Sequence, residues 1–109
     1  MNLTQYLLTK LAEECAAIAQ RASKANLFGI CEVQPGQPLD NAARIMDELT
    51  GLQVIVELLR ERGALPAASF DSTALAAKRA KVLRYTGYSA QCGVLQMDAA
   101  ETPAGFAPP

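Results

Sequence analysis

The sequence of 109 residues contains no histidine, no tryptophan and only three cysteines. Without histidine, the chain cannot form the Ser–His or Cys–His pairs that activate many enzymatic nucleophiles. Cys15, Cys31 and Cys92 are odd in number and include no CxxC pair, which argues against a structural zinc site and against a secreted disulfide framework. We interpret them as small thiols, buried or partly exposed, in a reducing compartment.

Long apolar runs and an excess of positive charge are also missing. No segment reaches the roughly 18 apolar residues of a membrane span, so we expect no membrane partner. The N-terminus has no basic region followed by an apolar one, which indicates no signal peptide and predicts a cytoplasmic protein. Ten basic residues against eleven acidic ones give a net charge of −1, which does not favour nucleic acid as a partner.

What the chain does contain is alanine, leucine and helical periodicity, which together predict an all-α protein. Apolar residues repeat at helical spacing over residues 3–27, with Leu3, Leu7, Leu11, Ile18, Ala22 and Ala25 on one side. We predict three helices: 3–27, capped by Asn2 or Thr4; a second from an Asp40 cap to about Arg62; and a third from an Asp71 or Ser72 cap to about Ala90. Gly29, Gly63 and Gly93 are the expected stops, and residues 30–40 read as a loop.

The predicted architecture is a long antiparallel helical hairpin followed by a third helix. We expect one domain over residues 1–93 and a flexible tail over residues 94–109, which are rich in Pro, Ala and Gly. A hairpin with one further helix covers only part of its apolar surface. Pairing with a second copy would complete a four-helix-type bundle, so we expect a homodimer or homotetramer. A monomeric three-helix bundle is the alternative.

Two acids interrupt the apolar stripes of the predicted hairpin. Glu14 lies in the middle of the stripe that contains Leu7, Leu11 and Ile18, whereas Glu48 lies at the margin of a stripe formed by Ile45, Leu49, Leu52, Val56 and Leu59. Burying a carboxylate costs several kcal/mol unless it is paired or bound to a cation. A shared Mg²⁺ would satisfy both groups. The alternative is that each pairs with a basic residue such as Arg21 or Lys81.

Basic residues gather in the third helix, in the segment KRAKVLRY at 78–85. Lys78, Lys81 and Tyr85 share one side of that helix and could hold phosphates. A solvated basic face that complements the acidic hairpin is the alternative. Arg21 and Lys24, near the end of the first helix, are further candidates for phosphate binding, although they could simply complement the helix dipole.

Together these segments resemble a known family. The stretch LAEECAAIAQRASKANLFGICEVQPGQPLDNAARIMDELTGLQVIVELL is similar to the core of the MazG-like all-α nucleoside-triphosphate pyrophosphohydrolases, and most of all to their small phage and bacterial versions. The resemblance implies an oligomeric helical bundle, in the host cytoplasm if the protein is phage-encoded. It also implies Mg²⁺, or Mn²⁺, held by an ExxE pair and an ExxD pair, and cleavage of a nucleotide to monophosphate and pyrophosphate.

The acidic pairs of that family are incomplete in this sequence. Glu14 is followed three residues later by Ala17, and Glu48 by Gly51. The resemblance therefore assigns catalysis and metal binding to Glu14 and Glu48, with Glu13 and Asp47 as further candidates for metal binding that could move in to compensate for the missing acids. Three functions follow: a Mg²⁺-dependent pyrophosphohydrolase with a reduced acid set, a non-catalytic nucleotide sponge or sensor, and a helical protein-interaction module.

Overall fold

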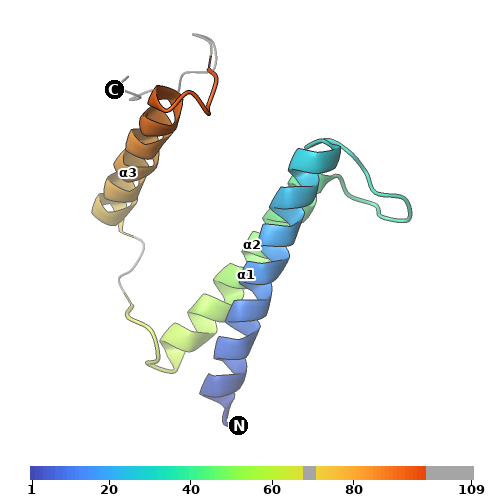
Figure 1. Ribbon diagram of the computed structural model, residues 1–109. Coiled ribbons are helices and arrows are strands. Elements are labelled where there is room, and N and C mark those ends of the chain that lie inside the picture. Colours follow the sequence, from blue (N-terminus) through green and yellow to red (C-terminus); the bar gives the residue numbers. More distant parts are fainter. Residues whose placement is uncertain (68–70, 98–109) are drawn as a thin grey trace. The chain divides into compact units, whose positions relative to one another are not determined.

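The computed structural model describes residues 1–67 and 71–97 (Figure 1). Within these ranges it contains three α-helices and no strand, which confirms the all-α prediction. The helices are α1 (Leu3–Phe28), α2 (Asn41–Glu61) and α3 (Ser72–Gln91). None of them is long and apolar enough to cross a bilayer.

The helices begin at the capping residues that the sequence predicts. Asn2 caps α1 in a capping box, because its side chain accepts from the Gln5 amide and the Gln5 side chain accepts from the Asn2 amide, both at 2.9 Å. Asp40 caps α2 by accepting from the Ala43 amide. Asp71, rather than Ser72, caps α3.

The ends of α2 and α3 share one local geometry. In α2, Gly63 has a φ of 73°, and the amides of Gly63 and Ala64 donate to the carbonyls of Arg60 and Leu59. These two bonds define a Schellman motif. The motif requires a left-handed backbone conformation, which glycine adopts without strain. Gly93 ends α3 in the same way, with the amides of Gly93 and Val94 donating to Ala90 and Ser89.

The first two helices form the antiparallel hairpin that the sequence predicts (Figure 1). At one end Arg62 Nε donates to Thr4 Oγ1 at 3.1 Å. At the other end Asn41 Nδ2 donates to the carbonyl of Gly29 at 2.8 Å. These bonds hold opposite ends of the two helices in register.

The chain divides into two compact units, Met1–Ala67 and Ala68–Pro109. The first contains the hairpin and the second contains α3. A single domain over residues 1–93 therefore stays a prediction. Of the predicted flexible tail at 94–109, residues 98–109 lie outside the described residues. Its first residues fold back on α3, because Leu95 as well as Val94 donates its amide to the Ser89 carbonyl.

The buried face of the hairpin differs in part from the predicted stripes. Leu7, Ala25 and Leu59 are its buried apolar residues, and Arg21 and Asn41 are buried with them. Ala22 and Leu3, which the periodicity placed on the inner face, are exposed; the inner face of α1 passes through Arg21 instead. On α2, Leu49 is exposed and Glu48 is half-buried. The prediction that Leu49 lies within the buried stripe and Glu48 at its margin was therefore wrong. Ile45, Glu48 and Leu52 follow one another at helical spacing and are all half-buried, so the contact face of α2 is turned toward this line.

Candidate functional site

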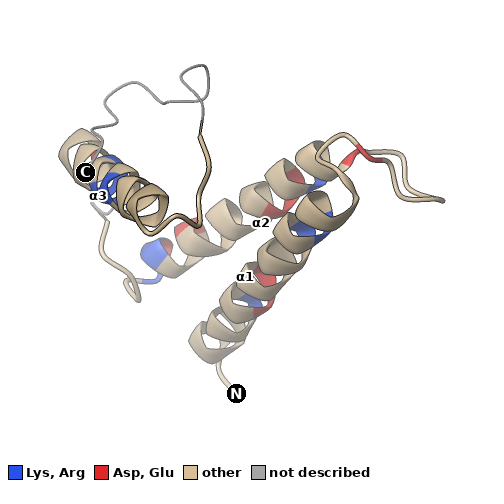
Figure 2. Cartoon of the chain, turned by 45° about the horizontal axis from the view of Figure 1, so that its top comes forward, with Lys and Arg blue, Asp and Glu red and all other residues tan. Residues whose placement is uncertain are grey.

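Glu14 occupies the middle of the hairpin interface and lies against a glycine of the opposite helix. A Cβ atom added to Gly51 would lie 3.2 Å from Glu14 Oε2 and 3.4 Å from Oε1. The missing side chain at Gly51 thus leaves the space that the Glu14 carboxyl group fills. Glu48 precedes Gly51 by three residues and so lies on the same side of α2. Acidic positions on both helices of the hairpin are red in Figure 2.

Glu14 and Glu48 are close enough to perturb one another. The pKa of Glu14 is raised above its ordinary value, first by a hydrogen bond with Glu48, then by burial and by the charge of Glu48. Two carboxyl groups can make that bond only when one of them carries a proton. Glu14 Oε2 is buried, and no hydrogen-bond partner for it exists among the described residues. The hairpin therefore holds two acidic groups together, and one oxygen of Glu14 has no hydrogen-bond partner among the described residues.

This arrangement predicts a pH dependence of stability. Because folding raises the pKa of Glu14 above 4.5, the native chain binds more protons than the unfolded chain between those two pKa values. The free energy of unfolding should then be highest below about pH 4.5 for this group and should fall as the pH rises through the raised pKa. Thermal unfolding of the wild type and of Glu14→Gln, from about pH 4 to 8, measures the effect.

The expected result is that Glu14→Gln loses this decline, whereas Glu13→Gln retains it. Glu13 is the matched control because it is the neighbouring residue, is exposed, and is bound instead to Lys10. Equal slopes for Glu14→Gln and the wild type would show that Glu14 does not carry the proton.

The two further acids named by the sequence are more exposed than the half-buried pair of Glu14 and Glu48. Glu13 is exposed and forms an ion pair with Lys10 at 2.9 Å, which raises the pKa of Lys10. Asp47 is exposed, yet its charge contributes to the raised pKa of Glu14. The positive charge of Lys10 lowers the pKa of Glu14 and so acts in the opposite direction. Asp47 is thus near enough to act on the site through charge, whereas Glu13 is engaged elsewhere.

Arg21 lies on the same face of α1 as Glu14, two turns further along the helix. Seven residues correspond to about 10 Å of rise and a rotation of only about 20°. The Arg21 side chain is 7% exposed, and its Nη1 atom has no hydrogen-bond partner within the described ranges. Arg21 and Glu14 form no ion pair with each other, so the predicted alternative of that pairing is wrong. The inner face holds a buried guanidinium that lacks a counter-charge at Nη1.

The basic residues of α3 belong to the second unit and are described separately. Lys78, Lys81 and Tyr85 are all exposed on α3. The guanidinium of Arg84 lies 5.3 Å from the centre of the Tyr85 ring, within the range of a cation–π contact. Their role in phosphate binding stays a prediction.

No group of three or more His, Cys, Asp or Glu residues within 1–67 and 71–97 could hold a metal ion. A cation between Glu14 and Glu48 would therefore have two carboxylate ligands, with other oxygen atoms, water or a bound ligand completing its coordination. Mg²⁺ is commonly bound in this way, through one or two carboxylates and the phosphates of a substrate. The three cysteines are free and exposed, so the prediction of partly exposed thiols holds and that of burial does not.

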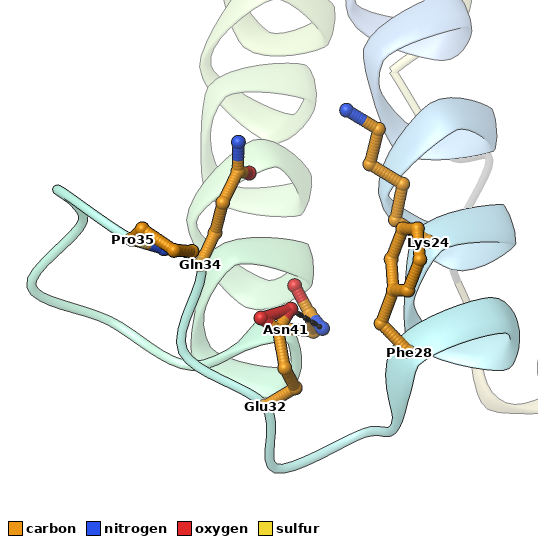
Figure 3. A pocket seen from close by; sticks show the side chains of 6 residues that line it. All are labelled: Lys24, Phe28, Glu32, Gln34, Pro35 and Asn41. Atoms are coloured by element: carbon orange, nitrogen blue, oxygen red, sulfur yellow. Dashed lines mark hydrogen bonds between the residues drawn. The ribbon is translucent and has the colours of Figure 1, made fainter.

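Sequence reasoning missed a hollow of about 550 Å³ at the loop end of the hairpin. Its walls come from α1, from the loop and from the first residue of α2 (Figure 3). They are formed by Lys24, Phe28, Glu32, Gln34, Pro35 and Asn41. Of these only Lys24 was a predicted site residue. The segment QPGQ, a turn signal beside the aromatic Phe28, is the one sequence feature that could have pointed to it.

These features define a two-helix hairpin with a pair of acids and a buried arginine on its inner face. Comparison of the chain with models of known protein families, with curated proteins and with solved structures finds no match. Only the residues of the site therefore bear on the function.

Proposed function

We propose that this protein binds a nucleoside triphosphate as its Mg²⁺ complex on the inner face of the α1–α2 hairpin and hydrolyses it to monophosphate and pyrophosphate. One observation carries the proposal: the Glu14 carboxyl group is held beside Glu48 and against Gly51, with a buried oxygen that lacks a protein partner. A divalent cation would satisfy that oxygen and neutralise the repulsion between the two acids.

Each residue of the inner face has a defined part in this proposal. Glu14 and Glu48 would hold Mg²⁺, or Mn²⁺ in its place. When bound, the ion supplies charge neutralisation at the phosphates and a more acidic water. Arg21 would bind a phosphate oxygen through its unpartnered Nη1, and Lys24 would contribute a second positive charge near the loop. Asp47 lies close enough to strengthen the negative potential at the cation.

A second candidate is a nucleotide-binding protein without turnover, which would act as a sponge or sensor. The observation that favours it is the absence of a third acid from the centre of the described hairpin. Ala17, half-buried one turn after Glu14, and Gly51 offer no carboxylate where the resemblance expects one. Losing two ligand charges weakens cation binding more than it weakens phosphate binding by Arg21 and Lys24.

Self-association belongs to the same proposal. Large apolar side chains remain exposed on both helices of the hairpin, including Leu8, Leu27, Met46, Val54 and Leu58. Packing a second copy against them would remove apolar surface from water. A nucleotide substrate and three free thiols fit the reducing environment of the cytoplasm.

The proposal is tested with purified full-length protein and a panel of ribo- and deoxyribonucleoside triphosphates, with Mg²⁺ or Mn²⁺. The expected result is release of pyrophosphate that stops when the cation is chelated. Nucleotide-dependent thermal stabilisation without pyrophosphate release would instead establish the binding protein. If neither occurs with any nucleotide, the proposal fails and the remaining function is a helical interaction module.

A further inference from the structure

The hollow at the loop end of the hairpin is lined by groups of distinct chemistry. In Figure 3, Lys24 and Phe28 rise from α1 on one side and Gln34 and Pro35 from the loop on the other, with Glu32 and Asn41 between them. Phe28 is 62% exposed, so one face of its ring is accessible to a ligand. An accessible ring beside polar side chains is the composition of a site for a flat, polar molecule.

Hydrogen bonds fix this wall before any ligand arrives. Asn41 is 1% exposed, and its Nδ2 donates to the Gly29 carbonyl at 2.8 Å and to Glu32 Oε1 at 3.3 Å. The Asn41 amide also donates to the Glu32 carbonyl. Glu32 and Asn41 are therefore held in one arrangement by bonds that run between the loop and the start of α2.

The loop itself is held by a turn and by a side-chain bond. Gln37 donates its amide to the Gln34 carbonyl across Pro35 and Gly36, and Gly36 has a φ of 82°. Proline followed by a glycine of positive φ is the pattern of a type II turn. Arg44 Nη1 donates to Gln34 Oε1 at 2.9 Å, which ties the turn to α2. The site is thus preformed, and little ordering should oppose binding.

The Glu32 carboxylate at the centre of this wall is a hydrogen-bond acceptor, whereas Lys24 and Gln34 supply donor groups at its sides. Glu32 has lone pairs beyond the one that Asn41 uses, and Asn41, which is 1% exposed, holds this carboxylate in place. A base stacked on Phe28 would meet the Glu32 carboxylate at its edge. An exocyclic amino group, as in cytosine, supplies the donors that such an edge needs, whereas the carbonyl of uracil at the same position is repelled.

The distance between the paired acids and the loop-end hollow matches the length of one nucleotide. Lys24 lies ten residues beyond Glu14 on α1, or about 15 Å along the axis, with Arg21 between them. This length is comparable to that of an extended nucleoside triphosphate. In Figure 3 the Lys24 side chain extends away from the loop, back along α1, where the sugar and phosphates would lie.

The geometry points to this hollow as a base-recognition site that selects an amino-bearing base over uracil or thymine, with Phe28 as the stacking platform and Glu32, held in place by Asn41, as the acceptor. The inference rests on the proposed function, since the hollow would bind the base of the nucleotide whose phosphates lie at the paired acids. It adds a selectivity that the paired acids cannot supply, because they contact only the cation.

Calorimetric titration of the full-length protein with the α,β-methylene analogues of CTP and UTP, in the presence of Mg²⁺, tests it. These analogues resist cleavage between the α- and β-phosphates and differ in the amino and carbonyl groups of the base. The cytidine analogue is expected to bind roughly 5- to 150-fold more tightly than the uridine analogue. Glu32→Gln keeps an oxygen for Asn41 but replaces an acceptor with a donor, so it should abolish most of that preference. Glu61→Gln, an exposed acid at the end of α2, is the matched control and should retain it.

The outcomes separate this inference from the proposed function. Mg²⁺-dependent binding with equal affinity for both analogues would overturn the base site and leave the phosphate site standing. Failure of both analogues to bind would overturn both. A cytidine preference that persists in Glu32→Gln would remove Glu32 from recognition. If Glu32→Gln loses its helical circular dichroism, Phe28→Ala, at an exposed side chain, takes its place and should weaken both analogues by at least about fivefold. Unchanged affinity in Phe28→Ala would overturn the stacking role.

Discussion

Replacing Glu14 with glutamine is expected to reduce Mg²⁺-dependent pyrophosphate release by at least about 100-fold in kcat/KM. Changes in the outer coordination shell of a metal already cost roughly 10- to 100-fold, and Glu14 would be a direct ligand in a site with only two protein carboxylates. The glutamine keeps the size of the side chain against Gly51 but removes the charge. Steady-state rates with Mg²⁺ and with Mn²⁺, over a range of metal concentrations, provide the measurement.

Glu13→Gln is the control and should stay within about twofold of the wild type, since Glu13 is exposed and paired with Lys10. A second readout separates loss of function from loss of fold. Without metal, Glu14→Gln should be more stable than the wild type near neutral pH, because it removes a like charge beside Glu48. Equal activity of Glu14→Gln and Glu13→Gln would exclude Glu14 as a metal ligand.

Restoring carboxylates at positions 17 and 51 is expected to tighten Mn²⁺ binding by roughly tenfold or more. Ala17→Glu with Gly51→Asp would give each helix two acids at i and i+3, and the affinity of oxygen-ligand sites rises with the number of ligand charges. The Gly51 substitution is feasible because its nearest neighbour would be the end of the flexible Glu14 side chain, 3.2 Å from the new Cβ. A shift of a few tenths of an ångström by that carboxyl group would relieve the contact.

Paramagnetic resonance titration with Mn²⁺ measures this affinity directly. The double variant Ala17→Gln with Gly51→Asn has nearly the same shape without the charges, and it should bind no better than the wild type. In the absence of metal, the charged double variant should be the less stable of the two, because four acids then face one another. Equal Mn²⁺ affinities for the two variants would show that the hairpin does not bring positions 17 and 51 to one ion.

The helix boundaries were predictable because their signals are local. Asn2, Asp40 and Asp71 cap helices through bonds to amides three residues away, and such bonds can be read from a short stretch of sequence. The glycines at 63 and 93 act just as locally. Periodicity also placed Glu14 correctly within the inner face of α1.

The details of the interface were less predictable because they depend on how two helices meet. Periodicity alone put Leu49 inside and Glu48 at the margin, whereas the contact with α1 reverses them. Ala22 is likewise exposed, while the longer and charged Arg21 is buried. An apolar stripe leaves the rotation of a helix about its own axis uncertain by about one residue. Only the contact with the partner helix determines that rotation. The loop-end hollow was missed because its walls come from three segments held by bonds such as Asn41 to Gly29.

The buried Arg21 links the folding of this chain to the solution around it. Its Nη1 is removed from water without a protein partner. The unliganded hairpin is therefore less stable than it would be if this atom had a hydrogen-bond partner. Any anion that reaches this guanidinium recovers part of the lost hydration and shifts the folding equilibrium by mass action. The stability of the hairpin should then depend on the buffer anion. Phosphate or sulfate would stabilise it by binding Arg21 and would compete with a nucleotide for the same site.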